Sequence, residues 1–207
     1  MGRKRKSTED SKDAVGRDMR EHDRVTAVLS PFSGVEFVPS EILQRAAERG
    51  TRVHKIIDGI ILGFECDEEV ESDVAPYIVS FKKFWADSQN SLDGHLSLRE
   101  TRFFCDEKKI TGQLDFLVVK GDKTLIFDWK TSQEEQISWK LQGAAYQYLA
   151  EINGYRNIQP VIFVQLSKYG AGPKLYSYGD QFENICAFFK CLDIYRFFDM
   201  KNTRGGM

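Results

Sequence analysis

The sequence predicts an α/β (α+β) fold in which a central mixed β-sheet is flanked by helices. Apolar residues recur at helical spacing between residues 40 and 61, and three strand-like segments follow one another between residues 96 and 131. Helical and extended patterns then alternate to the end of the chain. Helices, an antiparallel meander, a helix, further strands and a last helix form the order expected for such a sheet.

The size and charge of the chain limit what it can be. Its 207 residues are enough for one compact domain, and 42% hydrophobic with 29% charged residues is typical of a soluble globular protein. The formal net charge is −2, whereas nucleic-acid-binding proteins often carry a large positive excess. Any contact with phosphate is therefore expected to come from a local patch or from a bound metal.

The N-terminal segment differs from the rest of the chain. Residues 1–23 are polar and charged without hydrophobic periodicity, which predicts a disordered arm before a single domain at residues 24–207. The basic run at residues 3–6 can touch nucleic acid or remain solvated. No apolar run is long enough to span a membrane, and the start lacks the apolar segment of a secretory signal. We expect a cytoplasmic, or otherwise intracellular, protein without a membrane partner.

The first part of the domain is expected to be mainly helical. Residues 23–37 have the pattern of a short strand and a loop, and a helix opens after Pro39 with Ser40 as its N-cap. A second helix is expected over residues 73–89. The first helix carries an apolar stripe at spacings of four and three residues, which predicts one buried face: Leu43, Ala47, Gly50, His54, Ile57 and Ile61.

Strands dominate the middle of the domain and helices its end. The three meander strands are expected at residues 96–104, 110–119 and 124–131. The next helix, at residues 134–152, has an apolar stripe of Ile137, Leu141, Ala144 and Tyr148. The remaining elements are expected to be strands at 159–166 and 174–178 and an amphipathic helix at 180–198.

Two short turns set the register of the meander. Pairing outward from the Gly-Asp hairpin turn at residues 120–123 places Asp115 opposite Asp128. A turn at residues 106–109 likewise places Glu100 opposite Asp115. These registers align three carboxylates across three adjacent strands.

A row of adjacent carboxylates needs a positive charge nearby to offset the repulsion between them. Like charges directly opposite one another destabilise a sheet, and a divalent cation removes that conflict. Oxygen ligands suit Mg²⁺ or Mn²⁺. Lys130 shares a face with Asp128 because side chains alternate along a strand. The alternative is that these are ordinary solvated carboxylates, but Asp128 and Lys130 interrupt a strand that is otherwise apolar.

Four short motifs resemble those of a known family. GQLDFLVV, LIFDWKTS and QGAAY, in this order, are similar to the PD-(D/E)XK nuclease superfamily, which has a restriction-endonuclease-like core. They most resemble the RecB/AddB-like exonuclease group, with its small phage and mitochondrial stand-alone members. In this group the motifs are a helical histidine, G-x-x-D, D-x-K and Q-x-x-x-Y, here His54, Gly112–Asp115, Asp128–Lys130 and Gln142–Tyr146. The resemblance covers about residues 25–178.

The resemblance implies a role for each matching residue. It implies a metal site made of His54, Asp115, Asp128 and the main-chain carbonyl of Trp129. It implies that Lys130 positions or activates the attacking water and stabilises the charge that develops in the transition state. The catalytic centre would then combine metal chemistry with one cation.

Four other assignments are less direct. The resemblance implies that Gln142 and Tyr146 hold DNA near the scissile phosphate, and Glu100 matches a carboxylate that is often catalytic in these enzymes. Lys168, at a strand end, can contact a phosphate. Gln142 and Tyr146 can instead be a half-exposed packing pair, and Lys168 a solvated side chain. For the helical His54, the alternative is a core residue.

The function implied is that of a metal-dependent deoxyribonuclease, with Mg²⁺ or Mn²⁺ as its cofactor. An exonuclease that acts on free DNA ends in recombination, repair or replication is expected, in company with recombination or replication proteins. A catalytically inactive nucleic-acid-binding module of the same fold and a structure-specific endonuclease are the alternatives. The intact D…D-x-K set favours an active enzyme.

The cysteines argue against an iron–sulfur cluster. Some members of the group hold one through a cysteine before the histidine and three near the C-terminus. This sequence has no cysteine before His54, and only Cys186 and Cys191 lie late in the chain. No cluster is therefore expected, and the cysteines are expected to be free thiols.

Overall fold

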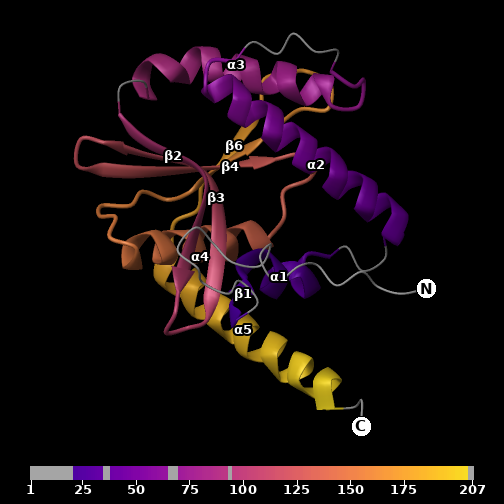
Figure 1. Cartoon of the computed structure of the whole chain (residues 1–207), viewed down its shortest axis with the longest axis vertical. Helices are drawn as coiled ribbons and strands as arrows, with labels where there is room; N and C mark the ends of the chain where they lie inside the picture. The colour runs from indigo at the N-terminus through magenta and orange to yellow at the C-terminus, as the bar shows by residue number, and fades with distance from the viewer. Residues whose placement is uncertain (1–20, 35–37, 65–69, 93–94, 205–207) are drawn as a thin grey trace.

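The computed structural model describes residues 21–34, 38–64, 70–92 and 95–204, with side chains to residue 199. Within these residues a six-stranded mixed β-sheet lies between two groups of helices (Figure 1). The predicted α/β class, a central mixed sheet flanked by helices, is confirmed. No helix in the described part of the chain combines the length and the apolar character that crossing a bilayer requires.

The helices divide between the two faces of the sheet. One face is covered by α2 (Ser40–Ile61) and α3 (Ala75–Leu92). The other face is covered by α1 (Val25–Leu29), α4 (Ser138–Ile152) and α5 (Gln181–Arg204) (Figure 1). A short 3-10 turn, η3 (Ser30–Phe32), follows α1.

The sheet combines antiparallel and parallel pairs. Its strands are β1 (Asp23–Arg24), β2 (Leu96–Cys105), β3 (Ile110–Lys120), β4 (Lys123–Lys130), β5 (Ile162–Gln165) and β6 (Lys174–Tyr176). The β2–β3–β4 meander is antiparallel, as predicted. After β4 the chain crosses over through α4, so that β5 pairs with β4 in parallel, and β6 then returns antiparallel to β5. β1 pairs with the start of β3 in parallel.

Both predicted registers are confirmed. Lys120 pairs with Lys123 next to the turn, where Gly121 has a φ of 62° that a side chain would disfavour. Arg99–Phe116 and Thr101–Leu114 pair on either side of the position where Glu100 faces Asp115. The turn chemistry fixed the register of both pairs, but the β3–β4 ladder ends at Phe116–Phe127, so the predicted pair Asp115–Asp128 lies just beyond its paired part.

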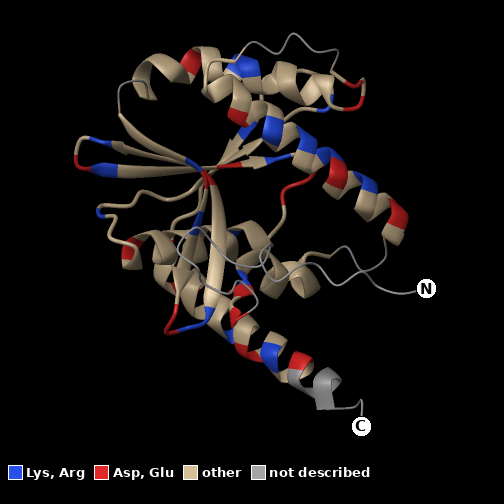
Figure 2. Ribbon diagram, viewed as in Figure 1, with Lys and Arg blue, Asp and Glu red and all other residues tan. Residues whose placement is uncertain are grey.

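The apolar stripe of α2 was predicted wrongly in its first half. Val53 and Ile57 are buried against the sheet, but Leu43 is half-exposed and Ala47 is exposed. Acidic and basic residues alternate along this outer part of the helix (Figure 2). Helical periodicity identifies a face but not what the face contacts, and the first half of this face borders a cavity.

Three boundaries also differ from the prediction. The helix that was expected from residue 134 begins at Ser138, which leaves Ile137 75% exposed rather than in the apolar stripe. Val25–Leu29 is a short helix, where a loop was expected. The folded part already includes His22 and Asp23, which were assigned to the arm; residues 1–20 lie outside the described residues.

Contacts with the body of the protein explain why residues 22 and 23 are ordered. The buried His22 ring contacts the Asp106 carboxylate through Nε2 at 2.8 Å. Asp23 accepts a hydrogen bond from Arg196 of α5 at 2.7 Å. Both partners are distant in the sequence, so local composition could not reveal these contacts.

Two apolar clusters hold the sheet between its helices. Towards α3, aromatic rings pack on one another: Phe81, Phe84, Phe116, Phe127 and Trp129. Towards α4 and α5, the core is built mainly from Leu114, Ile126, Trp139, Leu149 and Phe163. The sheet is therefore fixed on both faces, and polar side chains on it are held in a rigid frame.

Candidate active site

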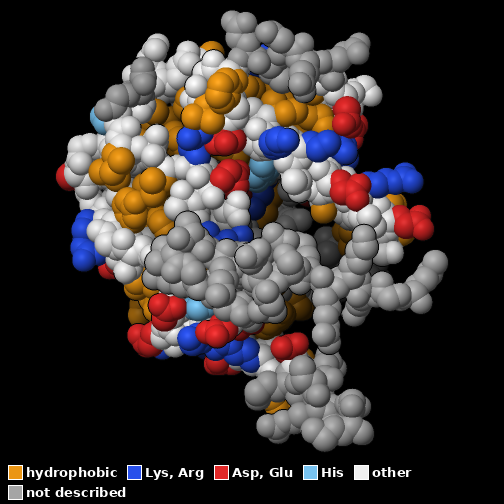
Figure 3. Space-filling model, viewed as in Figure 1, with side chains coloured by type: hydrophobic (Ala, Val, Ile, Leu, Met, Phe, Trp, Pro, Cys, Tyr) orange, Lys and Arg blue, Asp and Glu red, His pale blue; other side chains and the backbone are white. Residues whose placement is uncertain are grey.

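A cavity of about 850 Å³ opens where β3 and β4 separate. Residues of β3, β4, α2, α4 and the segment around α1 line it. The face of the molecule in Figure 3 has a hollow, and acidic, basic and histidine side chains surround it. All four motifs of the sequence contribute residues to the cavity.

An aspartate side chain marks the point where the two strands separate. The β3–β4 ladder ends at the pair Phe116–Phe127. Beyond it, the Trp129 N–H donates to Asp115 Oδ2 at 2.7 Å instead of to a main-chain carbonyl. Asp115 thereby satisfies a buried donor of the neighbouring strand, and its second oxygen is left to face the cavity.

Three side chains form a group that fits a divalent cation. His54, Glu100 and Asp115 each offer a ligand atom, and these atoms lie within 4.8 Å of one another. His54 Nδ1 is 3.3 Å from Asp115 Oδ1 and 3.7 Å from Glu100 Oε1. One imidazole nitrogen and two carboxylates are a suitable donor set for Mg²⁺ or Mn²⁺.

Glu100 reaches this group through an unusual backbone conformation. It lies within β2 at a φ of 46°, a left-handed conformation that a non-glycine residue rarely adopts. Its Oε2 accepts a hydrogen bond from Gln113 Nε2 at 2.6 Å, while Oε1 faces His54. Strained residues of this kind cluster at functional sites, and here the strain turns a carboxylate towards the cavity.

The imidazole of His54 lies between a carbonyl and the carboxylates. Its Nε2 donates to the Trp129 carbonyl at 3.0 Å, and its Nδ1 faces Asp115 and Glu100. Burial by itself lowers the pKa of His54, but Asp115, Glu100 and Asp128 outweigh it and raise the pKa well above its ordinary value. Without a metal, the ring is therefore held in its protonated form at neutral pH.

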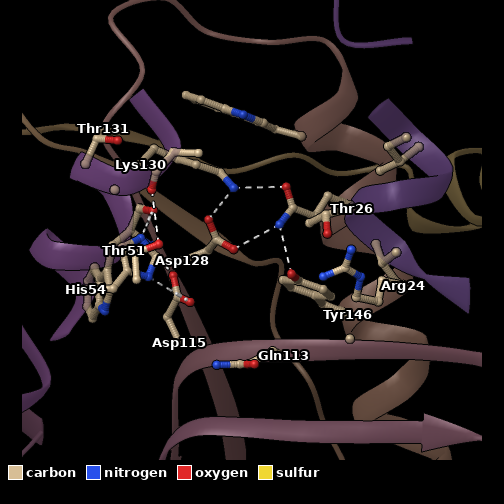
Figure 4. A pocket seen from close by; sticks show the side chains of 18 of the residues that line it. Arg24, Thr26, Thr51, His54, Gln113, Asp115, Asp128, Lys130, Thr131 and Tyr146 are labelled. Atoms are coloured by element: carbon tan, nitrogen blue, oxygen red, sulfur yellow. Dashed lines mark hydrogen bonds and ion pairs between the residues drawn. The ribbon is translucent and has the colours of Figure 1, made fainter. Parts of the chain in front are cut away.

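The second carboxylate of the D…D-x-K set faces a lysine. Asp128 Oδ2 is 2.6 Å from Lys130 Nζ. Gln142 links the two residues: its Oε1 accepts from Lys130 at 2.9 Å, and its Nε2 donates to Asp128 Oδ1 at 3.0 Å. The same Nε2 donates to the Tyr146 hydroxyl at 3.0 Å. Figure 4 shows this chain of contacts across the cavity.

Burial and charge oppose each other at Asp128. Asp128 is 3% exposed, and burial raises its pKa above the ordinary value although the nearby Lys130 lowers it. Burial also raises the pKa of Tyr146, so the phenol remains a neutral hydrogen-bonding group. The network is therefore fixed by hydrogen bonds in a setting where an unpaired polar group would be costly.

A glycine allows α4 to approach the sheet at this point. A Cβ atom at Gly112 would lie 2.8 Å from Leu149 Cδ1 and 2.9 Å from Tyr146 Cε1. Only a residue without a side chain leaves room for the Tyr146 ring directly over β3. The glycine of the G-x-x-D motif thus determines how closely the Q-x-x-x-Y helix packs on the sheet.

The structure brings together most, but not all, of the predicted site residues. Glu100 joins the possible ligand group, whereas Asp128 faces Lys130. Trp129 presents its carbonyl to His54 while its ring is buried. Gln142 and Tyr146, which had a half-exposed alternative, are 6% and 3% exposed. Lys168 is exposed and does not line the cavity, so a DNA contact there stays a prediction.

Sequence reasoning missed three polar residues of the cavity. Gln113 bridges Glu100 and Arg102, and Arg24 lies on the same side. The register that sets Glu100 opposite Asp115 also sets Gln113 opposite Arg102, as in the structure, and that pairing was the available signal. No signal in the sequence linked Arg24 to this strand, because the connection is a two-residue parallel pairing.

The three cysteines that the structure describes take no part in the cavity. Cys105, Cys186 and Cys191 are free thiols, and none of the three lines the cavity. Cys66 lies outside the described residues.

Comparisons with known proteins agree with this geometry. The model of the PD-(D/E)XK nuclease superfamily matches residues 32–171. A crystal structure from Eubacterium rectale, of a protein provisionally described as an exonuclease, is similar with a TM-score of 0.55 at 13% identity. It covers 86% of this chain and 82% of its own. That likeness concerns the fold.

Other comparisons add little. The crystal structure of LHK-Exo in complex with dAMP covers 90% of this chain and 95% of its own, at 11% identity, but its TM-score of 0.34 is too low to carry an argument. No curated protein matches the sequence.

Proposed function

The chain belongs to the PD-(D/E)XK nuclease superfamily, and from this membership and its cavity we propose that it is a metal-dependent deoxyribonuclease acting at DNA ends. The observation that carries the proposal is the joint presence of a possible ligand group and an Asp–Lys pair in one cavity. A catalytically inactive module would have no need for a half-buried lysine beside a carboxylate that is costly to bury.

The metal would be held by His54, Glu100 and Asp115, with the Trp129 carbonyl and Asp128 next to them. A divalent cation held there would withdraw electron density from the scissile phosphate and would make a nearby water more acidic. The protein contributes by fixing the positions of the side chains that would bind the metal. Asp115 is fixed by the Trp129 N–H, and Glu100 is fixed by Gln113.

Lys130 would act on the reacting groups themselves. Its ammonium group is held by Asp128 and by Gln142 Oε1, so it does not need to reorganise when charge develops on the phosphate. It can orient the attacking water by donating a hydrogen bond and can stabilise the negative charge of the transition state. We assign to Gln142 and Tyr146 the task of keeping this Asp–Lys pair aligned, in addition to any contact with DNA.

The preference for DNA ends rests on the resemblance of the four motifs to the RecB/AddB-like group. Substrate choice would then depend on access of a strand end to the cavity. This makes the topology of the DNA the most direct variable to test.

The function is tested by comparing matched linear and closed circular DNA with Mg²⁺, Mn²⁺, Ca²⁺ or EDTA. We expect cleavage of the linear form with Mg²⁺ or Mn²⁺, little with Ca²⁺ and none in EDTA. Rapid cutting of closed circles would make the enzyme an endonuclease. Full activity in EDTA would exclude the metal mechanism, and a lack of cleavage under all conditions would indicate a binding module.

Metal binding is expected to release a proton and to strengthen with pH. The raised pKa of His54 means that a metal must displace its proton at neutral pH, because only the neutral imidazole binds a metal. Below that pKa, apparent affinity should fall about tenfold per pH unit for one displaced proton. Calorimetry in buffers of different ionisation enthalpy measures the release directly.

The matched control for this pH effect is His54→Gln. The variant should bind metal more weakly and with less proton release near neutral pH, since its amide carries no proton to displace. If His54→Gln changed neither the metal affinity nor the number of protons released on binding, the role of His54 would be purely structural.

A further inference from the structure

The cavity has a basic side as well as an acidic one. Arg24 from β1 and Arg102 from β2 both line it, and Thr26 lines it as well. In Figure 4, Arg24 and Thr26 lie near Tyr146 on the opposite side of the view from His54. The side chains that could hold a metal and the two guanidinium groups therefore face the same space from different directions.

Within the part of the chain that the structure describes, the two arginines lie near each other without a carboxylate partner. Burial, and then the charge of Arg24, lowers the pKa of Arg102, although a guanidinium stays protonated in proteins. In the described part of the chain, neither arginine forms an ion pair with a carboxylate. Two neighbouring like charges lower the stability of the free protein, and an anion between them would remove that cost.

Hydrogen bonds fix the position of one arginine relative to the acidic group. Arg102 Nη2 donates to Gln113 Oε1 at 2.6 Å, and Gln113 Nε2 donates to Glu100 Oε2 at 2.6 Å. Glu100 belongs in turn to the possible ligand group. An amide bridge thus sets the spacing between Arg102 and the place where a scissile phosphate would be cut.

We propose that Arg24 and Arg102 form a second phosphate subsite, which holds another phosphate group of the DNA strand while the scissile one lies at the metal group. This proposal rests on the proposed nuclease function and extends it by naming the residues that position the DNA strand. Guanidinium groups bind phosphate oxygens in bidentate fashion, and the Thr26 hydroxyl can add a donor. Contacts of this kind fix the register of a nucleic acid without reading its sequence.

The phosphate in this subsite can be a terminal monoester or an internal diester. Both present non-bridging anionic oxygens that arginine can bind, so the two sources have to be separated by experiment. The probe is a short fluorescein-labelled DNA, single-stranded or duplex, bound to the protein in Ca²⁺ and followed by anisotropy. One set of probes differs only in having or lacking a terminal phosphate at either end. A second set carries a single neutral methylphosphonate at each internal position in turn.

Arg24→Gln is the principal variant because Arg24 is exposed and its loss should leave the fold intact. It should weaken DNA binding roughly tenfold, as expected for a charge-assisted hydrogen bond. The slope of log affinity against log salt should fall by about 0.7–0.9, corresponding to one phosphate contact. Arg102→Gln should do the same, with its melting temperature measured alongside. Lys123→Gln, at the exposed β3–β4 turn, removes a charge outside the cavity and should change neither quantity.

The probes then identify the phosphate. Neutralising or removing one particular phosphate of the DNA should weaken binding to the wild type but not to Arg24→Gln. The position of that phosphate in the probe then shows whether the subsite holds a terminal or an internal phosphate. Either position supports the subsite. An Arg24→Gln protein with wild-type affinity and salt slope would overturn it. If the wild type cleaves no DNA while the arginine variants still bind it less tightly, the nuclease proposal fails and the phosphate subsite stands.

Discussion

Replacing Lys130 by alanine is expected to lower the rate of DNA cleavage by roughly 10³-fold, the scale of losing one charged group that acts in the transition state. The ammonium group is held between Asp128 and Gln142, and it faces the same cavity as the possible ligand group. Lys130 belongs to neither apolar cluster, and Asp128, whose pKa is raised by burial, can take up a proton when the lysine is lost. We therefore expect the fold and DNA binding to be largely retained.

Single-turnover cleavage of a labelled linear DNA, with anisotropy and thermal melting alongside, measures the three properties separately. Lys168→Ala is the matched control, because that lysine is exposed and outside the cavity. A loss confined to the cleavage rate supports a transition-state role. Cleavage by Lys130→Ala at nearly the wild-type rate would show that the D-x-K assignment is wrong.

Asp128→Asn should be about as damaging, at roughly 10³-fold in rate. The substitution keeps the shape of the side chain, and the amide oxygen can still accept from Gln142 Nε2. It removes the negative charge that holds Lys130 and that lies near His54. We expect weaker metal binding and a misaligned lysine, with a folded protein.

Asp87→Asn is the appropriate control, since Asp87 is an exposed carboxylate on α3 that does not line the cavity. Cleavage across a range of Mg²⁺ concentrations separates the two effects of Asp128→Asn. Partial recovery at high Mg²⁺ reports lost metal affinity, and a rate that stays low at saturation reports loss of lysine alignment. A variant with wild-type cleavage at every concentration would contradict both roles.

Sequence patterns were most informative where chemistry is local. The Gly-Asp turn at residues 120–123 fixed the register of β3 and β4, and through it the position of Asp115 and Asp128. Strand alternation and a short turn act over a few residues, so one sequence is sufficient to read them. The separation of the two strands at Phe116–Phe127 was not predictable, because it depends on a side chain of one strand satisfying the main chain of the other.

Sequence patterns were less informative where tertiary contacts determine whether a residue is buried. The stripe of α2 has the correct period, but Ala47 and Gly50 border the cavity instead of the core. Ile137 fits an apolar stripe by spacing and yet precedes the helix and is exposed. Arg24 reaches the cavity only because β1 pairs with β3, far along the sequence. Such contacts are tertiary, and hydrophobic spacing carries no information about them.

The conformation of Glu100 has a consequence for anyone who engineers this protein. Glycine and asparagine adopt a φ of 46° with less strain than glutamate does. Either replacement at position 100 should therefore raise the melting temperature or leave it unchanged. Removing the carboxylate also relieves its repulsion with Asp115, which offsets the loss of its contacts with His54 and Gln113. A screen that rewards thermal stability alone would thus favour variants that have lost a candidate metal ligand, and the protein should be stabilised only under simultaneous selection for cleavage.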